Sequence, residues 1–261
     1  MNKGTIQIYG RNMVKDGLMS EARVSGVMIT NQVRNEVKIK EIIQLCETRK
    51  IQVTFAASEV VEKMTGTTTH QGILANIELP EASLTDILTK KNPLILLLHH
   101  IDYEQNLGAI MRTAWASNVD LIVASPNGVC EVTSVVAKVS NGGAVYVPLV
   151  AMSLFNAIAL IKKAGFPVVG VEVDKGEVYT KADLTGGLAV LMGGEAVGLS
   201  EPLIKDCDRL VHIPMAGGIA SLNVSVATAL ILFERMRQRR GVSGLNCTVG
   251  VIGRRVDGVE F

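Results

Sequence analysis

Three short segments of this 261-residue sequence combine glycine with amide, carboxylate, guanidinium and hydroxyl side chains. The first contains Asn106 and Arg112, the second Glu195, and the third Ser221 and Asn223. Each segment follows an apolar run, and ligands of a parallel sheet bind beyond the carboxyl ends of its strands. These side chains could position a substrate, stabilise developing charge and assist proton transfer, so they are candidate catalytic residues.

Each candidate also has an ordinary structural interpretation that the sequence leaves open. Asn106 and Asn223 lie at the starts of predicted helices, where asparagine is a favoured N-cap. Glu195 could simply lie near the helix that follows Ser200, and Arg112 could be a solvated surface cation. Asn106 and Arg112 would be about 120° apart around a helix axis, so both reach one site only if Asn106 belongs to the cap or loop.

The elements that position these segments alternate between apolar strands and helices from Pro93 onward. Continuous apolar runs such as Leu94–Leu98 and Leu188–Met192 indicate strands buried on both faces. The predicted fold class is therefore α/β, with a parallel sheet and helices on both faces. Further strands are predicted at Leu121–Ala124, Val145–Pro148, Val168–Val173 and Leu210–Ile213, and helices at Leu107–Ser117, Val132–Val139, Ser153–Ala164, Glu201–Cys207 and Leu222–Arg239.

A small α/β domain is predicted ahead of this sheet, over residues 1–80, followed by a polar linker at residues 81–92. The larger domain would then span residues 93–240. The glycine-rich tail, residues 241–261, has little periodicity and is expected to be loosely ordered. In the front domain, strands are expected at Thr5–Tyr9, Val24–Ile29, Ile51–Phe55 and Ile73–Ile77, and helices at Arg11–Met19, Val37–Arg49 and Ser58–Met64, with Ser58 as the N-cap.

Composition excludes several classes of protein. A balance of 26 basic and 25 acidic residues gives a formal net charge of +1, which argues against coating nucleic acid by bulk charge but permits a local basic face. No apolar run approaches the ~18 residues that cross a bilayer, and no targeting segment is apparent. The 4 cysteines form no CxxC pair and have no histidine at zinc-ligand spacing, which indicates reduced thiols in a cytoplasmic protein without a metal site.

Taken together, the three segments resemble the signature motifs of the SpoU/TrmH family of RNA ribose 2′-O-methyltransferases, in the family's order. The resemblance covers roughly Leu94 to Arg240 and includes the Ser-Asn-Gly-Gly run at residues 140–143. Residues 8–14 and 69–75 also look like segments of the subgroup that methylates a guanosine of 23S ribosomal RNA. The sequence contains no Walker A or GxGxxG motif, which disfavours a nucleotide triphosphatase or an NAD-type dehydrogenase.

The resemblance implies a fold and a reaction that the residues alone do not establish. The implied fold has a deep C-terminal trefoil knot, a front domain similar to ribosomal protein L30e, and a homodimer formed through the C-terminal domain. The implied methyl donor is S-adenosylmethionine, with Gly193, Ile213 and Leu222 as its contacts. The implied substrate is 23S ribosomal RNA; a transfer RNA substrate, or a non-catalytic RNA-binding or assembly factor that keeps the fold, are the alternatives.

Arg112 is the residue whose implied role needs the most chemical scrutiny. Its counterpart in the family has been proposed as the general base, but a guanidinium titrates above about 12 and stays protonated. We therefore expect Arg112 to bind the phosphate or ribose beside the target and to stabilise developing negative charge. That phosphate, or water, would take the proton. Glu195 would pair with Arg112 or accept hydrogen bonds from Asn223.

Candidate RNA contacts in the front domain are Arg11, Lys38 and His70. Acidic residues interleave with the cations of this domain, so there is no purely basic stripe, and contacts through RNA shape and splayed bases suit such a surface. A buried, hydrogen-bonded role for His70 is an equally good interpretation. Further cations of this domain that could contact RNA are Arg34, Lys40, Arg49 and Lys50.

The chain departs from the family pattern around its first two motifs. The family usually has aspartates at the positions of His99 and Tyr103, proline at Glu104 and glycine at Ala196, while Asp102 is shifted by one position from a family aspartate. These departures leave open the geometry of the RNA site and the choice between a ribosomal guanosine and a transfer RNA position.

Overall fold

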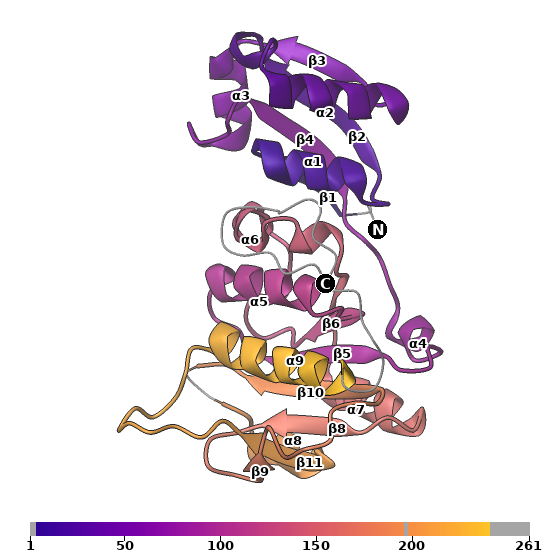
Figure 1. Cartoon of the computed structure of the whole chain (residues 1–261), viewed down its shortest axis with the longest axis vertical. Coiled ribbons are helices and arrows are strands. Elements are labelled where there is room, and N and C mark those ends of the chain that lie inside the picture. The colour runs from indigo at the N-terminus through magenta and orange to yellow at the C-terminus, as the bar shows by residue number, and fades with distance from the viewer. Residues whose placement is uncertain (1–3, 196–197, 241–261) are drawn as a thin grey trace.

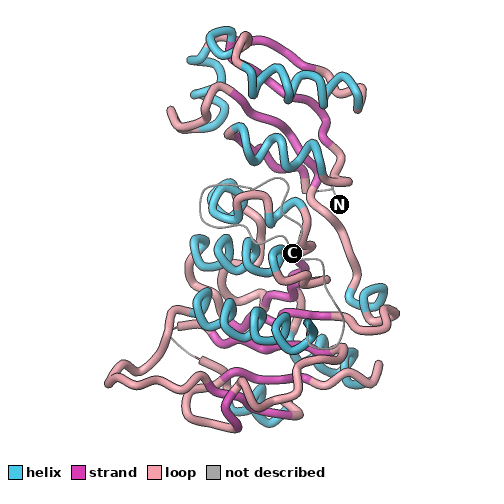
Figure 2. Tube along the Cα trace, viewed as in Figure 1, coloured by secondary structure: helices cyan, strands magenta, loops and turns pink. Residues whose placement is uncertain are grey.

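The computed structural model describes residues 4–195 and 198–240, which form two α/β parts stacked along the long axis of the molecule (Figure 1). We call residues 4–80 the front region and residues 93–240 the large region. The front region contains a four-stranded sheet and the large region a seven-stranded sheet, and both carry helices packed against them (Figure 2). The predicted tail, residues 241–261, and Ala196 lie outside the described residues.

The sheet of the front region is mixed, with strand order β1-β4-β2-β3. β4 pairs antiparallel with both β1 and β2, and β2 pairs parallel with β3. Its core is aliphatic, because Ile8, Ile29 and Ile42 are almost completely buried between the sheet and its helices. The elements are β1 (Thr5–Tyr9), α1 (Arg11–Met19), β2 (Val24–Thr30), η1 (Asn31–Val33), α2 (Val37–Thr48), β3 (Val53–Ala56), α3 (Ser58–Thr65) and β4 (Ile73–Glu78).

The sheet of the large region is parallel, with strand order β7-β6-β5-β10-β8-β11-β9. This confirms the α/β class with a parallel sheet that the apolar runs predict. The elements are β5 (Leu94–His99), α5 (Glu104–Ala116), β6 (Leu121–Ala124), α6 (Ser134–Ser140), η2 (Gly143–Val145), β7 (Leu149–Ala151), α7 (Leu154–Lys163), β8 (Val168–Val171), β9 (Glu177–Val178), β10 (Leu188–Gly193), α8 (Glu201–Asp206), β11 (Arg209–His212) and α9 (Val224–Arg240).

Both faces of this sheet are covered, which explains why its central strands are apolar at every position. Along β5, Leu96 packs into a core with residues of α5, α6 and α9, whereas the next residue, Leu97, packs into a second core with residues of α7 and α8. Successive side chains of a strand point to opposite faces. Figure 1 shows α5 and α9 side by side over the same part of the sheet.

Several predicted element boundaries differ from the structure, and for the strand predicted at Val145–Pro148 the local backbone shows why. Val145 and Val147 are buried like strand residues, yet Val145 ends the 3₁₀ helix η2, and the strand β7 begins only at Leu149. Gly142 has φ +99°, and its carbonyl accepts from the Val145 N–H at 3.0 Å, so the local turn takes the backbone groups that a strand would use. Ser58 is the first residue of α3, and Ala57 occupies the N-cap position.

The predicted linker contains an ordered helix, α4 (Leu84–Ile87). Ser83 caps it, because its hydroxyl accepts from the Asp86 N–H at 3.1 Å. Leu84 and Ile87 are buried in the core that includes α7 and α8, so this short helix packs against the large region. None of the helices among the described residues is long and apolar enough to cross a membrane.

The front region lies against α5, α6 and η2 of the large region. The Lys138 ammonium donates to Thr69 Oγ1 at 3.2 Å and lies 5.5 Å from the centre of the Tyr9 ring. Tyr146 donates its hydroxyl to the Asp16 carbonyl at 3.2 Å, and its ring stacks on Trp115 with centroids 4.3 Å apart. These polar and aromatic contacts join the two sheets into one molecule.

Candidate active site

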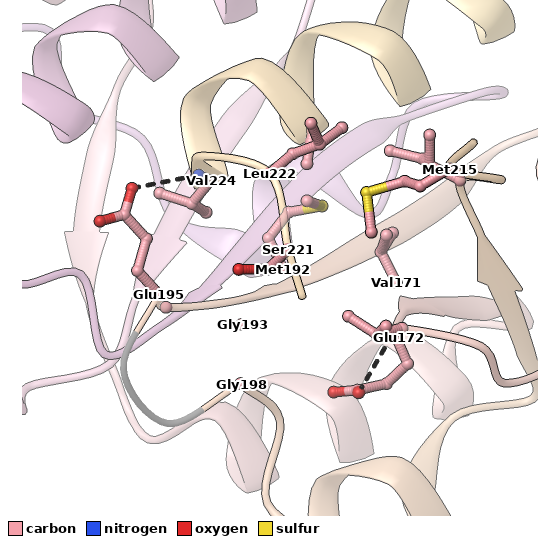
Figure 3. Close-up of a pocket in the computed structure, with 14 residues that line it drawn as sticks. Val171, Glu172, Met192, Gly193, Glu195, Gly198, Met215, Ser221, Leu222 and Val224 are labelled. Carbon is pink, nitrogen blue, oxygen red and sulfur yellow. Dashed lines mark hydrogen bonds between the residues drawn. The ribbon is translucent and has the colours of Figure 1, made fainter. Parts of the chain in front are cut away.

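A cavity of about 170 Å³ opens at the carboxyl ends of β8, β10 and β11 (Figure 3). Its lining is mostly apolar or glycine, and three described residues, Glu172, Glu195 and Ser221, contribute polar side chains. The lining comes from segments far apart in the sequence that the parallel sheet brings to one edge. The lining residues are Val171, Glu172, Val173, Met192, Gly193, Gly194, Glu195, Gly198, Ile213, Met215, Ser221, Leu222, Val224 and Ala227.

A cluster of hydrogen bonds beside this cavity joins Asn106, Glu195 and Asn223. The Asn106 amide donates to Glu195 Oε1 at 3.1 Å, and the Asn223 amide donates to Asn106 Oδ1 at 3.0 Å. Asn223 also donates to the same oxygen of Glu195. One residue from each of the three predicted segments therefore meets at a single place.

Asn223 holds the start of α9 as well as the cluster. Its Oδ1 accepts from the Ser225 N–H at 2.9 Å and from the Ser225 hydroxyl at 2.6 Å, so Asn223 caps the helix with its oxygen while its amide nitrogen serves the cluster. Glu195 Oε1 also lies 3.4 Å from the Val224 N–H, where the helix dipole favours a carboxylate. Asn223 thus both caps α9 and joins the cluster beside the cavity.

Asn106 reaches the cluster from inside a helix. α5 begins at Glu104, three residues before the predicted start at Leu107, so Asn106 lies in the first helical turn. Asn106 thus lies in the helix and not in the cap or loop, the condition under which Asn106 and Arg112 could both reach one site. Tyr103, which is 59% exposed, is the N-cap residue, and Glu104 places an acidic side chain in the first turn.

Arg112 does not join the cluster. Its side chain is exposed, two helical turns further along α5 than Asn106 and on another face. Within the described residues Arg112 makes no hydrogen bond or ion pair. Glu195 therefore takes the second of its two predicted partners, Asn223, and leaves the Arg112 guanidinium available to a ligand.

Gly193, Ile213 and Leu222, the predicted cofactor contacts, all line the cavity, and so does Ser221. A side chain at Gly193 would overlap with the backbone at Gly198. One at Gly194 would overlap with the carbonyl of His100. These two glycines allow three stretches of backbone to converge, and the cavity wall is consequently built largely of main chain.

Two side chains to which the sequence interpretation assigned no role in the site, Glu172 and His99, hold the far wall of the cavity. Glu172 Oε1 accepts from the Leu199 N–H at 2.9 Å, and the His99 ring Nδ1 lies 2.8 Å from the Gly198 carbonyl oxygen. The signal for Glu172 was its position after an apolar strand. That strand ends at Val171, whereas the prediction extended it to Val173 and so placed Glu172 inside it.

Asp102, which is shifted by one position from the family pattern, lies in the loop before α5. His100 Nδ1 lies 3.0 Å from Asp102 Oδ1, so the shifted aspartate has a partner in the same loop. The His100 N–H donates to the Ser125 hydroxyl at 3.0 Å, which ties this loop to the segment after β6.

The predicted RNA contacts of the front region have different surroundings. The Arg11 guanidinium donates to both carboxylate oxygens of Glu36, at 2.6 and 3.0 Å, and to the Gln71 carbonyl. Lys38 is exposed on α2. His70 is 4% exposed and its Nδ1 accepts from the Gly72 N–H at 2.9 Å, so its ring shapes the loop before β4 rather than facing solvent.

The described cysteines, Cys46, Cys130 and Cys207, are free thiols. Burial raises the pKa of Cys46 and the pKa of Cys207 to about 11, so both remain protonated near neutral pH. Cys247 lies outside the described residues. Across residues 4–195 and 198–240, no group of His, Cys, Asp and Glu is arranged to hold a metal ion.

Family models match almost the whole described chain. The model of the SpoU rRNA Methylase family matches residues 93–233, which include the cavity and the Asn106–Glu195–Asn223 cluster. A model described as RNA 2′-O ribose methyltransferase substrate binding matches residues 7–83. The boundary between the two matches falls near α4.

Relatives of similar length match most of the chain. The 23S rRNA (guanosine-2′-O-)-methyltransferase RlmB of Haemophilus influenzae is 35% identical, with 90% of this chain and 98% of the relative covered. A putative TrmH family tRNA/rRNA methyltransferase of Staphylococcus saprophyticus is 31% identical, with 90% and 96% covered.

Solved structures show the same fold at lower identity. The AdoMet-bound rRNA methyltransferase from Sinorhizobium meliloti has a TM-score of 0.76 and 23% identity, with 89% of this chain and 87% of that chain covered. The SpoU methyltransferase AviRb from Streptomyces viridochromogenes, in complex with AdoMet, has a TM-score of 0.78 and 22% identity, with 93% and 92% covered.

Proposed function

Because the chain belongs to the SpoU rRNA methylase family, as its motifs predict, we propose that it methylates the ribose 2′-hydroxyl of a guanosine in 23S ribosomal RNA. The observation that carries this proposal is the meeting of the Asn106–Glu195–Asn223 cluster with an apolar, glycine-walled cavity. The RlmB relative matched over 98% of its length favours a ribosomal guanosine as the target.

S-adenosylmethionine is the methyl donor in this proposal. The cavity fits it chemically, because Met192, Met215 and Leu222 offer apolar surface to an adenine ring, and the backbone around Gly193 offers hydrogen-bonding groups. When bound, the cofactor supplies a methyl group on a sulfonium that is already activated as a leaving group. The protein therefore needs to align the ribose hydroxyl and manage one proton.

The cluster residues provide the alignment. The mutual hydrogen bonds of Asn106, Glu195 and Asn223 fix the first turn of α5, the turn after β10 and the start of α9 relative to the cavity, so a ribose bound there meets a rigid wall. Arg112, with no partner among the described residues, is free to bind the phosphate or ribose beside the target. Its fork of donors stabilises the negative charge that develops on the 2′-oxygen, while the substrate phosphate or water accepts the proton.

The front region is proposed as the RNA substrate-binding domain, with residues 81–92 as the connection to the methyltransferase domain. Lys38, exposed on α2, is available for a phosphate contact. Arg11 reaches RNA only by exchanging its Glu36 partner, so its contribution is the smaller one. The proposal places the enzyme in the cytoplasm, in keeping with its free thiols.

A homodimer formed through α9 is the second part of the proposal. Val226 and Phe233, seven residues apart and hence on one helix face, are 48% and 49% exposed. A second copy of the chain would cover this apolar face. Phe233→Glu should convert a dimer to a monomer in light scattering, whereas Val60→Glu, at an exposed valine of the front region, should leave the dimer intact. A wild-type monomer at micromolar concentration would contradict this part.

The decisive test compares 2′-O-methyl positions in RNA from cells with and without the gene, and then repeats the methylation with purified protein and 23S ribosomal RNA transcripts. Loss of one 23S guanosine methylation, restored by the purified protein, is the expected result. Loss at a transfer RNA position would instead support the alternative substrate. Binding of S-adenosylmethionine without methyl transfer to either RNA would support the non-catalytic assembly factor.

A further inference from the structure

Glu172 places a second carboxylate on the cavity, away from the Asn106–Glu195–Asn223 cluster. It follows β8 directly and lines the cavity together with Val171 and Val173. Figure 3 shows Glu195 and Glu172 on different sides of the cavity, with Met192 and Ser221 between them. The cavity therefore has two acidic ends joined by an apolar middle.

The two carboxylates differ in how they are held. Glu195 accepts from two asparagine amides, so its orientation serves the loops around the reaction site. Glu172 is fixed by main chain: Oε1 accepts from the Leu199 N–H at 2.9 Å, and Oε2 lies 3.4 Å from the Val173 N–H. Each carboxylate oxygen can accept more than one hydrogen bond, so Glu172 retains acceptor capacity at the cavity.

A half-buried carboxylate beside an apolar cavity is stabilised when a ligand brings hydrogen-bond donors to it. The proposed cofactor carries two groups of donors that a carboxylate recognises: the vicinal hydroxyls of its ribose and the ammonium of its amino-acid end. The sulfonium, which carries the methyl group and is bonded both to the amino-acid chain and to the 5′ carbon of the ribose, must lie toward the cluster where the reaction takes place. The ribose links this sulfonium to the adenine, for which Met192, Met215 and Leu222 offer apolar surface, and Glu172 lines the same cavity as these residues.

We infer that Glu172 binds the ribose diol of the nucleoside cofactor, accepting hydrogen bonds from the vicinal hydroxyls, and so selects ribonucleosides over deoxyribonucleosides in this cavity. The inference rests on the proposed function, since it assumes an adenosine-containing methyl donor. Carboxylates perform the same task in dinucleotide-binding folds, where an acidic side chain accepts from a ribose hydroxyl.

The test is calorimetric binding of S-adenosylhomocysteine, of its 2′-deoxy and 3′-deoxy analogues, and of methylthioadenosine, which lacks the amino-acid end. The wild-type protein should bind at least one deoxy analogue about tenfold or more weakly than S-adenosylhomocysteine, the size of a hydrogen bond to a charged group. In Glu172→Ala this discrimination should fall to about twofold or less. Glu177→Ala, at an exposed glutamate of β9 outside the lining, should keep it.

Glu172→Gln provides a second variant, because its amide oxygen can still accept from Leu199 and so preserve the wall. It should also lose most of the discrimination, and wild-type discrimination in Glu172→Gln would overturn the inference. If Glu172→Ala weakens S-adenosylhomocysteine but leaves methylthioadenosine unchanged, the carboxylate serves the ammonium and the inference is wrong. If the wild-type protein binds none of these nucleosides, the proposed function itself fails.

Discussion

The front region and the large region use their polar side chains in opposite ways. In the large region, Asn106, Glu195 and Asn223 come from three distant segments and meet at the edge of the sheet beside a cavity. In the front region, Arg11 is paired with Glu36, and Arg49 donates to main-chain carbonyls around the end of α1. The hydrogen bonds of the large region position side chains beside the cavity, whereas those of the front region stabilise its fold.

This difference explains why the positions of the strand-end residues agree with the sequence prediction better than the roles predicted for the surface cations. Residues at the carboxyl ends of neighbouring parallel strands must converge, since the strands end at one edge. Surface cations have no such constraint. A nearby carboxylate or carbonyl can bind them within the protein, as the ion pair of Arg11 with Glu36 shows. Substitutions of cluster residues in the large region should therefore lower turnover more than stability, and substitutions of paired cations in the front region should lower stability more than turnover.

Asn223→Ala should have the largest effect on activity of all the substitutions. This change removes the amide that bridges Asn106 and Glu195, and a misplaced site loop should lower kcat/KM by about 100-fold or more. The lost helix cap should cost only about 1 kcal/mol of unfolding free energy. Methyl incorporation into RNA and urea unfolding, measured on one preparation, give the two quantities.

Ser225→Ala is the matched control for Asn223. It removes the hydroxyl that donates to Asn223 Oδ1 but leaves the Asn223 amide on its cluster partners. Its kcat/KM should stay within about fivefold of wild type. If the two variants lose activity in proportion to their loss of stability, Asn223 acts as a cap alone and the contrast between the regions disappears.

Arg112 should show the second-largest effect. Arg112→Ala should lower kcat/KM by about 10- to 100-fold, because a charged donor to phosphate or to the developing oxyanion is lost. Arg112→Lys should recover only part of this, since lysine lacks the bidentate fork. Arg23→Ala, which removes an exposed arginine paired with Glu78 at 3.5 Å, is the control and should change turnover little. Full turnover of Arg112→Lys at neutral pH would refute the proposed role.

Arg49, in the front region, should affect stability and not turnover. Its guanidinium donates to the carbonyls of Leu18, Ser20 and Ala22 at 2.7, 3.2 and 3.0 Å. Arg49→Ala should lower the unfolding free energy by about 2 kcal/mol, because these carbonyls lose a charged donor. Turnover per folded molecule should not change.

Lys40→Ala is the control for Arg49, since Lys40 is an exposed cation of the same helix region. It should leave both stability and turnover near wild type. If Arg49→Ala weakens RNA binding without lowering stability, Arg49 contacts RNA and does not mainly stabilise the front region.

These residues show which parts of the fold and of the candidate site can be predicted from the sequence. The periodicity of β5 and β10 predicts the parallel sheet because every position is buried, and the three motifs predict which residues meet. Helix geometry places Arg112 about 120° around the axis from Asn106, but the sequence does not predict that α5 begins at Glu104, because its N-cap residue, Tyr103, makes no side-chain capping bond. For His70 the sequence leaves an RNA contact and a buried role open, and the structure shows the buried one, which depends on the packing of the loop before β4.

The smallest predicted effect concerns two glutamates at opposite ends of α9: Glu195, from the turn after β10, lies beside its first residue, and Glu234 belongs to the helix. Glu195 is exposed at the start of the helix, whereas Glu234 is buried near its end and accepts from Arg237 at 2.8 Å. The hydrogen bonds from Arg237 lower the pKa of Glu234 below its usual 4.5. A carboxyl with a lowered pKa in the folded state stabilises the protein above its unfolded pKa and loses that contribution as the pH falls through the folded pKa.

Glu234→Gln removes this titration. The stability advantage of wild type over Glu234→Gln should be constant from pH 7 to about pH 5 and should then shrink as the medium becomes more acidic. Because Arg237 is largely exposed, the pH-dependent part should be about 1 kcal/mol or less. Melting temperatures of both proteins across this range give the measurement. An advantage that grows on acidification would mean that Glu234 is protonated in the folded protein, and its ion pair with Arg237 would then contribute nothing to α9.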